Sequence, residues 1–189
     1  MNKITIIDKG LSFFFLKFIP KKITPNHLTV MRFLSIPFVL FLLVLENYPA
    51  AIVLFSLSAF TDALDGALAR TTHQVTEWGK MYDPVADKIL IGTVVALVVS
   101  KNISPVLALT IICLELFIVL AALYKKKQSK VEIEAKKAGK VKMVFQSFGV
   151  GFLLLFLIWP VPFFFSLSII LLYLSLFFAA LSLFVYKSI

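Results

Sequence analysis

Apolar stretches long enough to cross a bilayer follow one another along most of the chain, and only short polar breaks separate them. A membrane-spanning helix needs roughly 20 mainly apolar residues. By that rule the predicted spans are 27–46, 50–71, 82–100, 104–124, 141–159 and 162–186. A water-soluble domain with 60% hydrophobic and 15% charged residues would lack the polar surface it needs. The sequence therefore predicts an all-α integral membrane protein with six transmembrane helices.

The first 22 residues are too interrupted by charge to span a bilayer. Ile4, Ile7 and Leu11 can share one helical face with Phe14, while neighbouring lysines can reach lipid headgroups. We therefore expect residues 1–22 to form an N-terminal amphipathic helix on the membrane surface. A partly ordered tail is the alternative. Residues 23–189 would then form the six-helix domain.

The positive charges predict how the chain is oriented. With six spans, both termini and the second-to-third and fourth-to-fifth connections lie on one side of the membrane. Of the 19 Lys and Arg residues, only Lys101 falls on the other side. Because positive charge marks the cytoplasmic side, we expect both termini to lie in the cytoplasm and the protein in the cytoplasmic membrane. The net charge of +9 then reflects orientation and attraction to anionic lipids, and no nucleic-acid partner is expected.

Four of the ten acidic residues form two closely spaced pairs in predicted spans. Asp62 and Asp65 are three apart, and Asp83 and Asp87 are four apart, so each pair shares one face of its helix. A short polar turn joins the two helices, which predicts that they are antiparallel neighbours. Charges in a span are costly and usually pair, bind ions or do chemistry. We expect the four carboxylates to converge near the cytoplasmic surface.

This set of carboxylates indicates a site for metal ions. Four negative charges at close range repel one another strongly unless cations neutralise them. Oxygen ligands without His or Cys suit hard ions, so the sequence predicts two Mg²⁺ or Mn²⁺ ions held by Asp62, Asp65, Asp83 and Asp87. Two such ions are typical of phosphoryl-type transfer, in which they stabilise the attacking and leaving oxygens.

The pattern resembles the signature of a known family. Residues 62–70 read Asp-Ala-Leu-Asp-Gly-Ala-Leu-Ala-Arg, and Gly79, Asp83 and Asp87 follow. This arrangement is similar to the complete motif of the CDP-alcohol phosphatidyltransferases. The resemblance implies a six-helix enzyme that transfers the phosphatidyl group of CDP-diacylglycerol to an alcohol and releases CMP. It also implies a homodimer, with metal ions held by the aspartates and Asp87 acting as the general base.

The same resemblance implies a binding site for the CDP-linked donor. The implied residues are Asn26, Thr29, Gly66, Ala69, Arg70, Thr76 and Gly79. The first two belong to the stretch from Thr24 to Thr29, which with Arg32 is similar to the family's entry into its first membrane helix. Without the resemblance, Pro25 and Asn26 indicate only a helix start, and small residues such as Gly66 also mediate plain helix packing.

The identity of the alcohol acceptor is less constrained. The stretch Gly139-Lys140-Val141-Lys142 resembles the Gly-Lys-x-Lys segment of phosphatidylglycerophosphate synthases, which implies that Lys140 and Lys142 bind the phosphate of glycerol 3-phosphate. A basic loop that holds anionic lipids is the alternative. Those synthases usually carry Arg-Glu where this chain has Leu114-Glu115. We expect Glu115 to face the interior, because a lipid-facing carboxylate is costly.

Other functions stay open at this point. The departure at Leu114 allows a cardiolipin synthase of the same family, with phosphatidylglycerol as acceptor, or an enzyme with an inositol phosphate acceptor. A small ion transporter would place acidic groups near the bilayer midplane within related halves. A non-catalytic membrane scaffold would not need the four aspartates. Neither of the last two would release CMP from CDP-diacylglycerol.

Overall fold

The computed structural model describes residues 25–71, 77–128 and 137–187, and the regular elements in these ranges are all helical. In chain order they are α2 (Pro25–Val44), α3 (Tyr48–Thr71), α4 (Glu77–Val94), the π-helix η2 (Val95–Val99), α5 (Ser100–Asn102), α6 (Pro105–Gln128), α7 (Lys137–Ile158) and α8 (Pro162–Lys187). The predicted surface helix over residues 1–22 lies outside the described residues.

Proline marks the start of several helices. Helices α2, α6 and α8 begin at Pro25, Pro105 and Pro162. Proline suits a first helical turn because the N–H that it lacks has no partner inside the helix there. At the start of α6, Ser104 caps the free end, since its Oγ accepts a hydrogen bond from the Leu107 N–H at 3.4 Å. The polar breaks in the sequence are therefore also the signals that begin the helices.

Some helices extend beyond the predicted spans where the chain is charged. Helix α4 begins at Glu77, α6 continues to Gln128, and α7 begins at Lys137. Hydropathy detects the segment that suits lipid, whereas Glu, Lys and Gln also favour a helix in water. The span boundaries predicted from hydropathy therefore differ from the helix ends at these three places.

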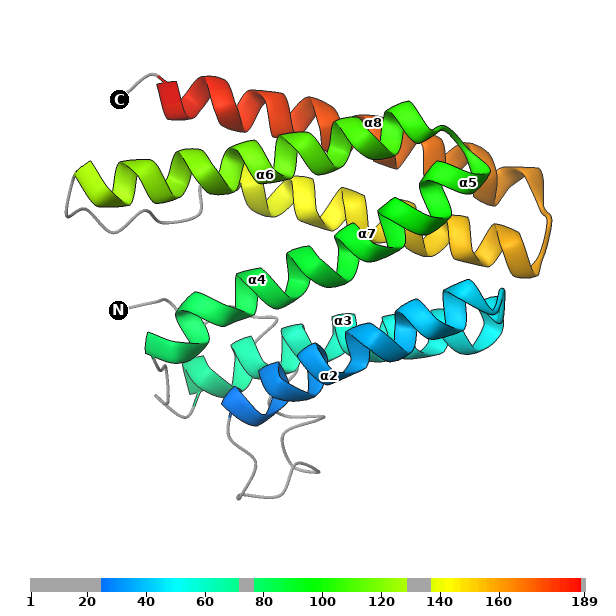
Figure 1. Ribbon diagram of the computed structural model, residues 1–189, viewed down its shortest axis with the longest axis horizontal. Helices are drawn as coiled ribbons and strands as arrows, with labels where there is room; N and C mark the ends of the chain where they lie inside the picture. Colours follow the sequence, from blue (N-terminus) through cyan, green and yellow to red (C-terminus); the bar gives the residue numbers. More distant parts are fainter. Residues whose placement is uncertain (1–24, 72–76, 129–136, 188–189) are drawn as a thin grey trace. The chain divides into compact units, whose positions relative to one another are not determined.

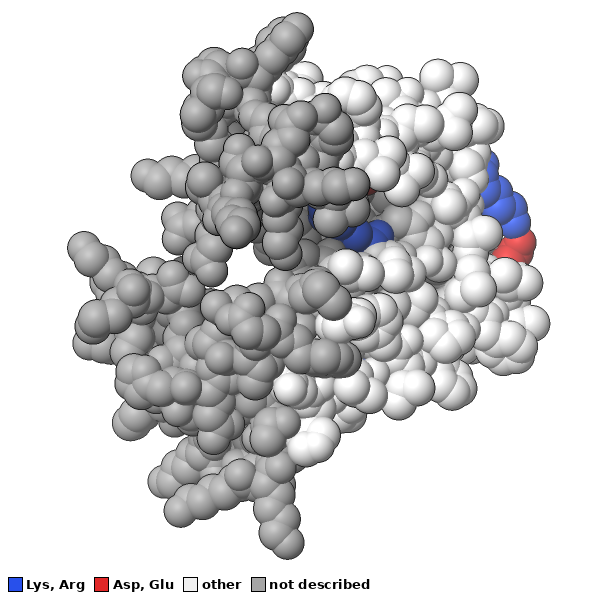
Figure 2. All heavy atoms as spheres, turned by 60° about the vertical axis from the view of Figure 1, so that its left-hand side comes forward, with Lys and Arg blue, Asp and Glu red and all other residues white. Residues whose placement is uncertain are grey.

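The described helices have the lengths and surfaces of a membrane protein. Three of them contain segments long and apolar enough to cross a membrane: Asn26–Val44, Val141–Ile158 and Pro162–Leu183. Shorter apolar helical segments cover Tyr48–Thr61 and Pro105–Ala121. Large apolar side chains such as Phe38 and Phe163 are exposed, while Thr29, Ser58 and Ser168 are buried. On the face shown in Figure 2, the described surface is almost entirely uncharged. Such a surface suits lipid.

The chain divides into two compact units, the first ending at Leu90 and the second beginning at Ile91. In the first unit, α2 and α3 lie side by side as a helical hairpin (Figure 1). Glu46 has a φ of 55° in the connecting turn. The next residue, Asn47, caps the start of α3, since its Oδ1 accepts a hydrogen bond from the Ala50 N–H at 3.3 Å.

In the second unit, α7 and α8 pack against each other along their lengths (Figure 1). Their contact approaches closely at Gly149, where an added Cβ would lie 3.0 Å from Cγ of Leu172. Buried positions on α8 recur at alternating spacings of four and three residues: Ser168, Leu172, Ser175, Ala179 and Ser182. Small and hydroxyl-bearing residues let membrane helices approach closely. The η2 segment contacts α6 and α7 and buries Val95, Val98 and Val99.

Candidate active site

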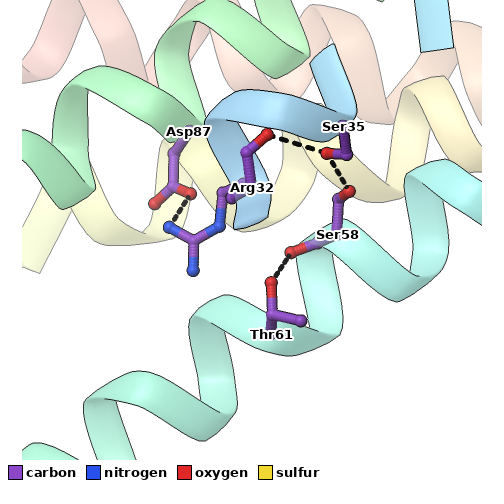
Figure 3. Close-up of polar contacts among 5 residues, drawn as sticks. All are labelled: Arg32, Ser35, Ser58, Thr61 and Asp87. Carbon is purple, nitrogen blue, oxygen red and sulfur yellow. Dashed lines mark hydrogen bonds and ion pairs between the residues drawn. The ribbon is translucent and has the colours of Figure 1, made fainter. Parts of the chain in front are cut away.

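A buried ion pair joins α2 to α4 within the first unit. The Arg32 Nη1 lies 2.8 Å from the Asp87 Oδ1, and the two side chains are 0% and 13% exposed (Figure 3). Removing either partner from such a pair leaves an uncompensated charge, which is strongly destabilising. Asp87, the expected general base, is therefore held in place by a charge on a neighbouring helix.

A hydroxyl network joins α2 to α3 beside this pair. The Ser35 Oγ donates to the Arg32 carbonyl at 2.8 Å and lies 2.5 Å from the Ser58 Oγ. On α3, the Thr61 Oγ1 donates to the Ser58 carbonyl at 2.7 Å (Figure 3). Because Ser35 lies one turn after Arg32, a single segment of α2 contacts both Asp87 on α4 and Ser58 on α3.

The face of α3 that carries Ser58 leads directly to the paired aspartates. Ala51, Phe55 and Ser58 are buried. Continuing their alternating spacing of four and three residues along the same helix reaches positions 62 and 65. The backbone therefore places Asp62 and Asp65 on one face, the face that is buried in the preceding turns. The structure does not describe their side chains.

Helix α4 carries the second pair and is held against α2 at two points. Asp83 and Asp87 lie four apart in α4, and the structure describes the side chain of Asp87 but not that of Asp83. The ring of Tyr82 meets Phe33 of α2 edge to face, with centroids 6.4 Å apart. With the Arg32–Asp87 ion pair, this contact fixes the side of α4 that faces α2.

The expected donor-site residues lie on these same helices. Asn26 and Thr29 lie on α2, six and three residues before Arg32, and Thr29 is buried. The helical backbone of α3 carries Gly66, Ala69 and Arg70, and α4 carries Gly79. Thr76 lies outside the described residues. The structure therefore places the donor-site residues that it describes on α2, α3 and α4.

The chemistry of the expected metal ligands fits hard divalent cations, because carboxylate oxygens are the ligands such ions prefer. Among the side chains that the structure describes, no group of three His, Cys, Asp or Glu side chains could hold a metal ion. The described side chains include that of Asp87 but not those of Asp62, Asp65 or Asp83. The metal site stays a prediction.

A second buried ion pair lies in the second unit. The Lys142 Nζ on α7 is 2.6 Å from the Glu115 Oε1 on α6, and the side chains are 4% and 16% exposed. The expectation that Glu115 faces the interior is confirmed. Lys142 therefore supplies the positive partner of Glu115 from the neighbouring helix α7. The side chain of Lys140, the other expected phosphate ligand, is not described.

Three of these contacts were not predicted from the sequence, and one of them is the pairing of Lys142 with Glu115. Arg32 was included only through the family-like segment before it, and its partner was not identified. The signal was available, since an Arg within an apolar helix requires a buried anion. Ser35 and Ser58 gave no such signal, because serine is common in membrane helices as a plain packing residue.

Comparison with known proteins places these features in a family. The family model described as CDP-alcohol phosphatidyltransferase matches residues 22–181. A CDP-diacylglycerol–glycerol-3-phosphate 3-phosphatidyltransferase of Rickettsia felis is 36% identical over 135 residues, covering 69% of this chain and 74% of its own. Proteins of the same name from Mycoplasma genitalium and Pseudomonas fluorescens are 31% and 42% identical over 153 and 81 residues. The matches cover 70% and 41% of this chain, and 64% and 42% of those relatives.

Proposed function

This chain belongs to the CDP-alcohol phosphatidyltransferase family, and we propose that it transfers the phosphatidyl group of CDP-diacylglycerol to glycerol 3-phosphate. The products would be phosphatidylglycerophosphate and CMP. The chain is thus a membrane transferase of phospholipid biosynthesis. The observation that carries the reaction proposal is the position of Asp87, a carboxylate fixed by a buried ion pair on the helix that also carries Asp83.

The proposed chemistry is a direct displacement. The acceptor hydroxyl oxygen attacks the lipid-side phosphorus of the donor, forming a new P–O bond while the P–O bond to CMP breaks. Asp87 accepts the hydroxyl proton as the oxygen attacks. Arg32 holds the Asp87 carboxylate at 2.8 Å, so that it needs little reorientation during the reaction.

Divalent ions fit the remaining carboxylates. Asp62, Asp65 and Asp83, with Asp87 as a further ligand, would hold two Mg²⁺ or Mn²⁺ ions. The ions would supply charge stabilisation at the diphosphate and the leaving group. Support comes from the oxygen-only donor set and from the backbone position of residues 62 and 65 on one face of α3. Asn26, Thr29, Gly66, Ala69, Arg70, Thr76 and Gly79 would bind the CDP group.

Glycerol 3-phosphate is the proposed acceptor because the relatives named above carry it in their names. Lys140 and Lys142 would bind its phosphate. Lys142 is buried and ion-paired, so its ammonium is held within the protein fold. A lysine that only attracted anionic lipids would be expected at the surface.

The membrane arrangement extends the same proposal. We infer six transmembrane spans, cytoplasmic termini, a surface helix at residues 1–22 and an active site at the cytoplasmic side, where anionic lipids lie near the basic segments. This arrangement is supported by the distribution of Lys and Arg along the sequence. A homodimer is inferred from the family resemblance.

The test is CMP release by purified protein in detergent with CDP-diacylglycerol and Mg²⁺. Glycerol 3-phosphate, phosphatidylglycerol and inositol phosphate are supplied in separate reactions, and Asp87→Asn is the inactive control. Release with glycerol 3-phosphate alone, lost in the control, supports the proposal. Release only with phosphatidylglycerol would make the protein a cardiolipin synthase and refute the proposed acceptor. Release that survives in Asp87→Asn would refute the general base.

A further inference from the structure

The ion pair between Glu115 and Lys142 leaves one carboxylate oxygen of Glu115 without a hydrogen-bond donor among the described residues. One carboxylate oxygen, Oε1, lies 2.6 Å from the Lys142 Nζ. The other, Oε2, is buried and has no hydrogen-bond partner among the described residues. A buried charged acceptor without a donor costs stability, and a membrane interior makes such a group more costly. The fold therefore keeps a costly carboxylate beside this lysine.

The surroundings of the pair are also polar. Gln146 lies four residues after Lys142 on the same face of α7, and it is 3% exposed. Beyond it, the buried positions of that face are apolar, at Val150, Leu153 and Leu154. Plain helix packing would be served by apolar residues at 142 and 146 as well. Two buried polar side chains thus lie one turn apart on α7, and one of them, Lys142, contacts Glu115 of α6.

We propose that Glu115 is a resident counter-ion, which neutralises Lys142 in the free enzyme and is displaced from it by the phosphate monoester of the acceptor. This inference rests on the proposed function, in which Lys142 binds the acceptor phosphate. Without the acceptor, Glu115 pairs with the buried Lys142 ammonium, which would otherwise lack a counter-ion. When the acceptor binds, the phosphate offers three acceptor oxygens and nearly two negative charges against the single charge of the carboxylate.

This arrangement makes Glu115 a specificity-determining residue. An uncharged alcohol such as glycerol cannot displace a carboxylate from an ammonium. A phosphodiester lipid, with one charge on its phosphate, competes less well than a monoester. Specificity is a difference between affinities, and a competing internal anion lowers the affinity for weakly charged acceptors more than for a dianion. Glu115 therefore costs some affinity for glycerol 3-phosphate and increases discrimination against other acceptors.

The experiment measures the KM for glycerol 3-phosphate and for CDP-diacylglycerol in full-length protein. In Glu115→Gln the KM for glycerol 3-phosphate is expected to fall by about three- to tenfold, while Lys142→Gln raises it by about tenfold or more, as for other close charge pairs. The KM for CDP-diacylglycerol stays unchanged in both. Ser168→Ala, which alters a buried polar residue of α8 in the same unit, is the matched control and leaves both constants unchanged.

Two further variants cover the case in which Glu115→Gln does not fold. Glu115→Asp keeps the charge but shortens the side chain, which moves the carboxylate away from the Lys142 ammonium. Like Glu115→Gln, it is therefore expected to lower the KM for glycerol 3-phosphate. The exchange of charges, Glu115→Lys with Lys142→Glu, keeps the ion pair. If the pair is only structural and Lys142 binds no phosphate, this double variant behaves as wild type, which overturns the inference. A raised KM for glycerol 3-phosphate with normal thermal stability supports phosphate binding by Lys142, on which the inference rests, and the KM values of Glu115→Gln and Glu115→Asp then decide the role of Glu115.

The outcomes also separate this inference from the proposed function. If the wild-type protein releases no CMP with glycerol 3-phosphate, the proposed acceptor fails and the inference fails with it. If the wild type is active with this acceptor but Glu115→Gln and Glu115→Asp fold with an unchanged or higher KM, the function stands and only the counter-ion role is overturned.

Discussion

Arg32 shows how one charge in an apolar helix can define a site. The side chain is fully buried and requires an anion, and it forms an ion pair with Asp87 on another helix. The guanidinium is planar and always charged, so it fixes the position of its partner more firmly than a flexible ammonium would. The carboxylate that the proposed reaction needs is therefore positioned by a residue that need not touch the substrate.

Replacing Arg32 is expected to reduce both activity and thermal stability, because it leaves the Asp87 carboxylate without its buried partner charge. Arg32→Gln removes the charge and should lower kcat for CMP release by about 100-fold, because truncating one side of a buried charge pair costs about 2–5 kcal/mol. Arg32→Lys keeps the positive charge but lacks the planar guanidinium group, and it should retain more activity than Arg32→Gln. The measurement is CMP release together with thermal unfolding in detergent.

The control for this prediction is Lys101→Gln, which removes an exposed positive charge from α5. Its activity and melting temperature should match those of the wild type. Equal activity in Arg32→Gln and Arg32→Lys would contradict the prediction, since it would mean that the charge on Arg32 does not matter for Asp87.

At the scale of helices, the contact between α7 and α8 depends on a missing side chain. Gly149 has no Cβ, and the Cγ and backbone nitrogen of Leu172 would lie 3.0 Å and 3.3 Å from one if it were added. The backbone atom cannot move without shifting α8. Gly151 on the same helix has nothing within 4 Å of its added Cβ. The chain thus offers a matched pair of glycines on one helix.

Gly149→Ala is expected to lower the free energy of unfolding by about 1–3 kcal/mol, the usual cost of inserting a methyl group into a packed contact. Gly151→Ala should cause no loss of stability. Leu172→Ala combined with Gly149→Ala should cost less than the sum of the two single changes, because neighbouring substitutions that share a contact are not additive. Thermal unfolding in detergent measures all four proteins. Equal destabilisation by the two glycine variants would contradict the close approach.

How much of the structure could be predicted differs between helices and contacts. Hydropathy predicted the all-helical fold and the approximate positions of the described helices, because it acts locally along the chain. Hydropathy missed the helix ends at Glu77 and Gln128, since a charged residue can remain helical outside lipid. The serine contact between α2 and α3 could not be predicted, because serine spacing alone does not say which helix lies opposite. The pairing of Lys142 with Glu115 was also missed, because the sequence does not say which helix lies opposite Glu115.

At the scale of the whole molecule, the buried polar residues and the exposed apolar ones reverse the pattern of a water-soluble protein. Arg32, Lys142 and Gln146 are each at most 3% exposed, whereas Phe38, Val106 and Phe163 are each more than 60% exposed. In lipid this distribution is favourable, because apolar side chains face hydrocarbon and charges are paired inside. The same physical constraint concentrates Lys and Arg outside the spans, and their distribution predicts the orientation of the chain.

The predicted orientation can be tested with single cysteines. In a Cys113→Ser background, Lys101→Cys and Val161→Cys are expected to react with a membrane-impermeant maleimide in intact cells, because they lie in the third-to-fourth and fifth-to-sixth connections. Ser129→Cys, in the basic fourth-to-fifth connection, should react only after the cells are permeabilised. Labelling of all three in permeabilised cells is the control for accessibility. Labelling of Ser129→Cys in intact cells would place the basic segment outside, and would contradict both the six-span arrangement and a cytoplasmic acceptor site.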